Sequence, residues 1–188
     1  MPGCFRIADR RAAKLLSPFL AGLGVVDGRP ILVTFRPRLT MLAGKLRSGE
    51  ERGTAVHAGS DLRRREIVLD SDLLDEPSEL RRIFAHEVYH FVWRRLGNPR
   101  RTAWEAVLAA ELSAGARGEL GWSAELAKSK LAGRAKIWRH YICESFCDTA
   151  AWMFSGCDQH DEYTLASMFR ERRRASMAAL LDRHETRV

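Results

Sequence analysis

The chain has 188 residues, of which 46% are hydrophobic, so it is long enough for one globular domain with a substantial core. It contains no apolar run near the roughly 18 residues of a membrane-spanning helix, and its start, residues 1–11, lacks the apolar region of a signal peptide. We therefore expect a single cytoplasmic domain over residues 1–188, and not a membrane protein.

The net charge of +7 raises the question of nucleic-acid binding. The basic clusters lie at residues 63–65, 100–101 and 170–174, dispersed along the chain, and no helix-turn-helix or zinc-finger spacing accompanies them. Arginine outnumbers lysine 26 to 5, which a GC-rich coding bias explains as readily as phosphate recognition does. A nucleic acid, or an acidic protein docked on these clusters, is therefore the less favoured partner.

The N-terminal part of the chain predicts one helix and a small sheet. Residues 10–23 have the pattern of a covering helix that is bent or begun near Pro18. Residues 30–35 and 65–70 are short β-rich runs between turn residues, and residues 53–59 are a candidate third strand. We expect a small mixed or antiparallel sheet ahead of the next helix.

Residues 77–96 predict a long helix. Pro77 suits its first turn, Glu79 places negative charge near the positive end of the helix dipole, and Gly97 with Pro99 ends the pattern. Two apolar stripes run along it at helical spacing: Leu80, Phe84, Val88 and Phe91 in one, and Ile83, His86, His90 and Trp93 in the other.

This helix carries the sequence His-Glu-Val-Tyr-His at residues 86–90, the most informative stretch of the chain. Residues four apart lie above one another on a helix, so His86 and His90 can reach one metal ion, and Glu87 projects towards a metal-bound water. Zn²⁺ lowers the pKa of such a water to roughly 7, where a carboxylate can take its proton. The alternative is that both histidines are core residues packed beside Phe84 and Trp93.

Further helical patterns follow at residues 101–117, 123–131, 137–154 and 163–184. The stretch 137–154 has the apolar character of a buried helix. The last pattern is amphipathic, and packing onto the domain is its expected role.

A catalytic zinc site needs a third protein ligand. The chain has no third histidine in the spacing H-E-x-x-H-x-x-G-x-x-H, but the buried segment 137–154 contains Glu144 and Asp148. Acids in such a segment need partners. Glu144 would complete a site of two histidines and one glutamate, and Asp148 would accept the N–H of a ligand imidazole. The alternative is a solvated or salt-bridged pair, with Arg139 as one partner.

Four cysteines, at positions 4, 143, 147 and 157, fit a reducing compartment. Cys143 and Cys147 are four residues apart and lack the C-x-x-C spacing of a zinc knuckle, so we expect buried free thiols. A competing thiolate ligand is the alternative.

These residues together resemble the gluzincin metallopeptidases, whose active-site helix carries H-E-x-x-H and whose second helix carries E-x-x-x-D. The resemblance covers residues 78–97 and 141–154, and residues 144–151 are similar to the second helix of the ImmA/IrrE-type minimal gluzincins. It implies that His86, His90 and Glu144 are the zinc ligands and that Glu87 is the general base. It also implies that Asp148 is the acidic residue that hydrogen-bonds a zinc ligand.

The resemblance also implies a zincin-like α+β fold, mostly helical, with a small sheet before the active-site helix. In such folds a strand ahead of that helix pairs with the extended substrate, and residues 67–69 are the candidate here, with an ordinary core strand as the alternative. The activity implied is hydrolysis of a peptide bond in a peptide or protein substrate.

The sequence leaves the oxyanion donor and the biological role open. Tyr141, His140, His160 and Tyr163 are candidate donors that the sequence does not rank. A zinc-binding regulator that acts through a protein or DNA partner is the main alternative to a protease, and a structural protein that has lost its metal is a further one.

Overall fold

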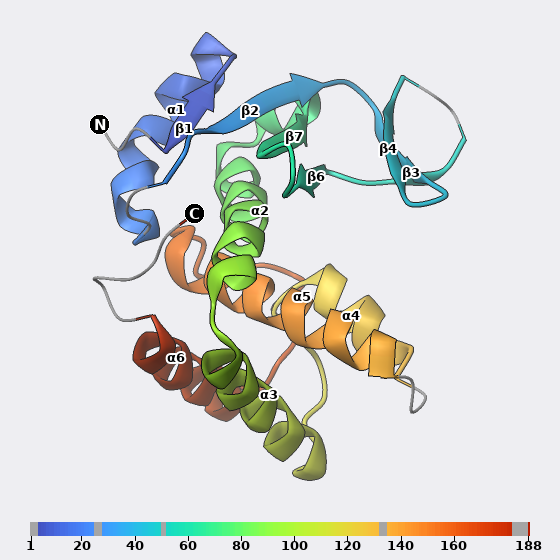
Figure 1. Ribbon diagram of the computed structural model, residues 1–188, viewed down its shortest axis with the longest axis vertical. Helices are drawn as coiled ribbons and strands as arrows, with labels where there is room; N and C mark the ends of the chain where they lie inside the picture. Colours follow the sequence, from blue (N-terminus) through green and yellow to red (C-terminus); the bar gives the residue numbers. More distant parts are fainter. Residues whose placement is uncertain (1–3, 25–27, 50–51, 132–134, 182–187) are drawn as a thin grey trace.

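The computed structural model describes residues 4–24, 28–49, 52–131, 135–181 and 188. It confirms the expected α+β class: the chain is mostly helical, and two small sheets precede the long helices (Figure 1). Among the described residues, none of the helices combines the length and the hydropathy of a membrane span.

The first sheet is mixed and has four strands in the order β1, β2, β7, β6. Three of them run parallel, and β6 runs antiparallel to β7. The second sheet is antiparallel, in the order β4, β3, β5, and lies to one side of the first (Figure 1). The bounds are β1 Phe5–Ile7, β2 Ile31–Arg36, β3 Leu39–Leu42, β4 Lys45–Ser48, β5 Thr54–Ala55, β6 Ala58–Asp61 and β7 Glu66–Asp70.

The predicted strands at 30–35 and 65–70 are confirmed as β2 and β7, whereas the candidate strand at 53–59 is two strands, β5 and β6, in different sheets. The proposed substrate strand at residues 67–69 is wrong. It belongs to β7, which is paired with β2 on one side and β6 on the other, so its backbone has no free edge for a peptide. Ile67 and Leu69 are fully buried, so the ordinary core strand is the correct interpretation.

The predicted helix at 77–96 is confirmed as α2, Pro77–Arg95. Pro77 occupies its first turn, and Arg94 with Arg95 places positive charge in its last turn, where the dipole favours it. Buried side chains lie on several faces, because α2 is covered by the sheet at one end and by helices along its length (Figure 1).

Helix α5, Ala135–Phe154, packs across α2 and holds the core together (Figure 1). Phe146 of α5 lies against two aromatic rings of α2, with centroid distances of 6.0 Å to Tyr89 and 5.0 Å to Trp93. Trp104 closes the cluster at 5.7 Å from Phe146, edge to face. The two helices that carry the predicted metal ligands are thereby fixed against each other.

The remaining helices surround this pair: α1 Arg10–Leu20 with the 3₁₀ turn Ala21–Leu23, α3 Asn98–Ser113, α4 Trp122–Ser129 and α6 Ser167–Leu180. Helix α1 begins at Arg10, after an Asp9 cap, and contains Pro18 in its interior, so it does not begin at the proline. Helix α6 begins later than the pattern at 163–184 predicts, because Tyr163 and Leu165 are buried in a second, smaller apolar cluster before the helix starts. It ends at Leu180, and residues 182–184 of the predicted helix lie outside the described residues.

Candidate metal centre

Helices α2 and α5 bring three potential ligand atoms together. His86 Nε2 and His90 Nε2 are 3.1 Å apart, one turn from each other on α2. Glu144 Oε2 of α5 lies 3.4 Å from His86 Nε2 and 3.9 Å from His90 Nε2. The structure therefore brings the three predicted ligands together, within 4.8 Å of one another.

These separations fit a tetrahedral cation. Two ligands at about 2.0–2.1 Å from a zinc ion, at the tetrahedral angle, lie about 3.4 Å apart. The distances among the two imidazole nitrogens and the Glu144 oxygen bracket that value. Two histidine nitrogens and one carboxylate oxygen are also a donor set that catalytic zinc sites use.

Asp148 fixes one of the two imidazoles. Its Oδ1 accepts the N–H of His86 Nδ1 at 2.7 Å, which leaves Nε2 as the nitrogen that points to Glu144. Its Oδ2 accepts the Ala124 backbone N–H at 2.9 Å, in the first turn of α4. Gly121 permits this approach, because a Cβ at that position would lie 2.3 Å from the Asp148 carboxyl carbon. Asp148 therefore holds His86 in this orientation and is itself held by α4.

His140 supports the other side of Glu144. Its Nδ1 lies 3.4 Å from Glu144 Oε1, one turn earlier on α5, so this oxygen faces His140 while Oε2 faces His86 and His90. Glu144 thus contacts three imidazoles, and Asp148 contacts His86 and a backbone amide. Glu144 and Asp148 therefore contact histidines and a backbone amide, and not Arg139, which was their alternative partner in a salt bridge.

Glu87 lines a small pocket together with the three potential ligands. Its Oε2 accepts a short hydrogen bond from Ser60 Oγ of β6. The pocket has a volume of about 260 Å³ and is lined by Ala58, Gly59, Ser60, Leu62, His86, Glu87, His90, Ser123 and Glu144. The carboxylate of Glu87 and the three potential ligands therefore share one cavity, bounded by β6, α2, α4 and α5.

The electrostatics of the site favour ionised groups. Burial lowers the pKa of His86, but the charge and hydrogen bond of Asp148, with a further contribution from Glu144, raise it well above its ordinary range. Burial also lowers the pKa of His90, yet Cys143 and Glu144 outweigh it and raise this pKa to about 9. Burial raises the pKa of Glu144, but the two imidazoles overcome it and lower it to about 2. Glu144 is therefore an anion at neutral pH.

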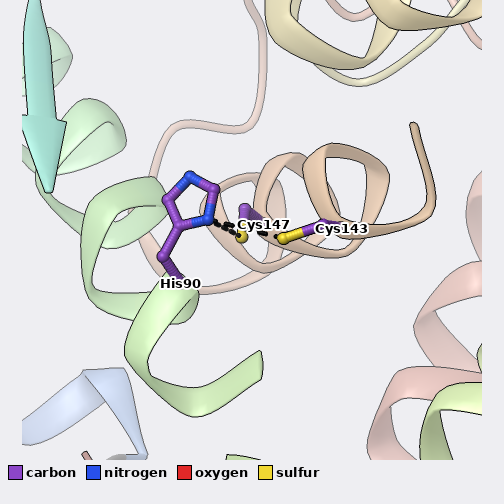
Figure 2. A group of neighbouring side chains, drawn as sticks. All are labelled: His90, Cys143 and Cys147. Carbon is purple, nitrogen blue, oxygen red and sulfur yellow. Dashed lines mark hydrogen bonds between the residues drawn. The ribbon is translucent and has the colours of Figure 1, made fainter. Parts of the chain in front are cut away.

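Two thiols contact His90 from the opposite side. Cys147 Sγ and Cys143 Sγ lie 3.4 Å and 3.5 Å from His90 Nδ1, and Figure 2 shows both sulfurs on this side of the ring. All four cysteines are free, as expected, and Cys143 is only partly buried. A hydrogen bond with Cys147 and the neighbouring His90 lower the pKa of Cys143 to about 6, although burial opposes this shift. Burial raises the pKa of Cys147.

The other candidate donors lie away from the pocket. The Tyr141 hydroxyl donates to Glu119 at 2.7 Å, in a buried charged cluster. His160 lies 3.3 Å from Glu79 and packs against Tyr163, whose side chain belongs to the second apolar cluster. Of the four, His140 is the one that contacts a site residue.

Sequence reasoning missed Ser60, Gly121 and the role of His140. The spacing of His140 and Glu144, four residues apart on a helix, could have indicated the last of these. No local signal connects Ser60 with Glu87, because strand pairing through β7 brings them together. No family profile matches this chain, and neither a curated protein nor a solved structure matches it significantly.

Proposed function

We propose that the protein is a zinc-dependent peptidase that hydrolyses peptide bonds with metal-activated water. The observation that carries this proposal is the convergence of His86, His90 and Glu144 in a pocket that Glu87 also lines. The resemblance to gluzincins in residues 78–97 and 141–154 supports the same function.

The donor set favours zinc over harder cations. Magnesium and calcium prefer a shell of oxygen ligands, whereas two imidazoles and one carboxylate suit zinc and leave a coordination position for water. When bound, zinc would acidify that water and polarise the scissile carbonyl. Asp148 and His140 would hold His86 and Glu144 in their orientations, as outer partners do in zinc sites.

Glu87 would act as the general base and then as the general acid. Its carboxylate would accept the water proton and donate it to the leaving amine. Ser60 Oγ donates a hydrogen bond to the carboxylate of Glu87. The same hydroxyl oxygen lies 3.3 Å from the backbone carbonyl oxygen of Glu87. The hydroxyl can therefore hold Glu87 at the pocket when no substrate is bound.

A peptide substrate would be aligned by β6. This strand is the last in the mixed sheet, is paired only with β7 among the described strands, and supplies Ala58, Gly59 and Ser60 to the pocket wall. An extended peptide added to its outer edge would place a scissile bond beside the site. The substrate strand expected from the resemblance is then β6, one strand further out than residues 67–69.

We expect Glu144→Ala to weaken zinc binding by at least about a hundredfold, since loss of an outer partner alone costs about 10–100-fold. Cys147→Ala should change zinc affinity far less, because its sulfur contacts His90 Nδ1 and not the nitrogen that faces Glu144. Competition with a chromophoric chelator measures both. The opposite order would assign zinc to the sulfur side of His90 and refute the proposed ligand set.

Zinc affinity should also rise with pH. The pKa values of both imidazoles are raised, that of His90 to about 9, so zinc must displace a proton from His90 below pH 9 and a further proton wherever His86 is protonated. Glu144, with a pKa of about 2, loses none in this range. We expect about a tenfold gain per pH unit for each proton displaced, measured from pH 6 to 9. An affinity that is constant over this range would contradict the account.

A further inference from the structure

His90 presents its two ring nitrogens to two different sets of potential ligands. Nε2 faces His86 and Glu144, whereas Nδ1 faces the sulfurs of Cys143 and Cys147. Figure 2 shows the second set, in which both thiols of α5 meet one edge of the imidazole. This arrangement differs from that of His86, whose Nδ1 is held by a carboxylate.

The sulfur set has the dimensions of a metal site. In a tetrahedral zinc site, with metal–sulfur and metal–nitrogen bonds of about 2.3 Å and 2.0 Å, the nitrogen and sulfur lie about 3.5 Å apart, which serves here as the reference for a small metal ion. The measured separations from His90 Nδ1 are 3.4 Å to Cys147 Sγ and 3.5 Å to Cys143 Sγ. The three atoms lie within 4.8 Å of one another.

The two thiols lie on the same side of α5 and face one imidazole nitrogen. Cys143 and Cys147 are four residues apart and thus lie on one side of the helix. Orientation of the His90 ring would need one acceptor, and a carboxylate or carbonyl is the usual choice. Two sulfurs at near-equal distances from one nitrogen exceed that need, and Cys143 is partly exposed.

We propose that His90, Cys143 and Cys147 form a second metal site for a thiophilic cation of the Cu⁺ or Cd²⁺ class, and that its occupation removes metal from the first site. Thiolate ligands select soft cations. The cation would bind Nδ1 and both sulfurs as thiolates, and the protons that the thiols and Nδ1 still carry would be released to solvent. No change of oxidation state is involved.

Exclusion follows from the chemistry of the shared imidazole. A neutral imidazole has one nitrogen with a free lone pair, and the other carries a proton. A metal on Nδ1 of His90 therefore places the proton on Nε2, which faces His86 and Glu144. The first site then keeps only two ligands. This inhibitory consequence rests on the proposed function, whereas the binding of a soft cation to the thiols does not.

The test is titration of the full-length, reduced protein with Cd²⁺, followed by the ultraviolet charge-transfer band of thiolate bound to cadmium. We expect one equivalent to produce the band in wild type and in Glu144→Ala, which retains the sulfur set. The band should be lost in the double variant Cys143→Ala, Cys147→Ala, and the affinity for Cd²⁺ should fall at least about a hundredfold in His90→Ala. Zinc-loaded wild type, which needs no substitution, should release one zinc per cadmium bound.

Several outcomes overturn the proposal. Absence of the thiolate band in wild type removes the second site, and a band of unchanged affinity in His90→Ala removes the shared ligand. One zinc and one cadmium held together by the same chain would refute exclusion. A wild type that binds no zinc but shows the thiolate band would instead count against the proposed peptidase function alone, because that band does not depend on the first site.

Discussion

Glu87→Gln is expected to retain zinc and to lose about 10²–10⁴-fold in peptide hydrolysis, the contribution typical of a general base. The amide has nearly the shape of the carboxylate and can still accept a hydrogen bond from Ser60 Oγ, so the pocket should keep its form. What the amide cannot do is take a proton from water. Cleavage of a fluorogenic peptide library and zinc content should be measured on the same preparation.

The matched control is Glu76→Gln, which makes the same chemical change at an exposed position at the start of α2. It should cleave the library like wild type. Cleavage by Glu87→Gln at the wild-type rate would refute the assigned role of this residue, and a loss of zinc in that variant would show that Glu87 serves the metal and not the proton transfer.

Arg173→Met should lower the free energy of unfolding by about 3–5 kcal/mol, the typical result of removing one partner of a buried ion pair. Arg173 of α6 is fully buried and donates to Glu111 at 2.7 Å and to Glu119 at 2.6 Å. Glu119 would keep Lys128 and the Tyr141 hydroxyl, but Glu111 would lose the partner that the structure gives it. Urea unfolding followed by circular dichroism measures the change.

Arg172→Met is the control for this prediction, because it removes the same charge from the adjacent, exposed position of α6. Its effect should stay within about 0.5 kcal/mol of wild type, as for most surface substitutions. Equal stability of the two variants would show that the buried charges contribute little. The network of Arg173, Glu111 and Glu119 joins α6, α3 and the segment before α4. A large loss of unfolding free energy in Arg173→Met would therefore show that this network stabilises the packing of these helices.

The helices and the site on them could be predicted because their signals are local. Pro77, the apolar stripes and Gly97 define α2 in sequence, and the spacing of His86 with His90 needs only helical geometry. Glu144 and Asp148 are predictable for a different physical reason, because acids in an apolar helix require partners. Contacts within one helix and the cost of burying a charge depend on residue types and their spacing, which can be read from the sequence.

Two features of the site could not be predicted from the sequence. One depends on how the strands pair, and the other on which nitrogen of the His90 ring faces α5. The order of β7 and β6 among the described strands decides which of the two lies at an edge of the sheet, and nothing local distinguishes them. The same order brings Ser60 to Glu87. The thiols were expected to be buried and free, but their contact with His90 Nδ1 follows from the rotation of α5 against α2.

The most direct test of the account is the metal content of protein purified without added zinc, by elemental analysis, for wild type and His86→Ala side by side. We predict about one zinc per chain in wild type and its loss in the variant, since His86 belongs to the proposed zinc site and not to the sulfur set on the other side of His90. Zinc retained in His86→Ala would place the metal at the sulfurs. A folded wild type that holds no metal and refuses added zinc would contradict the central claim altogether.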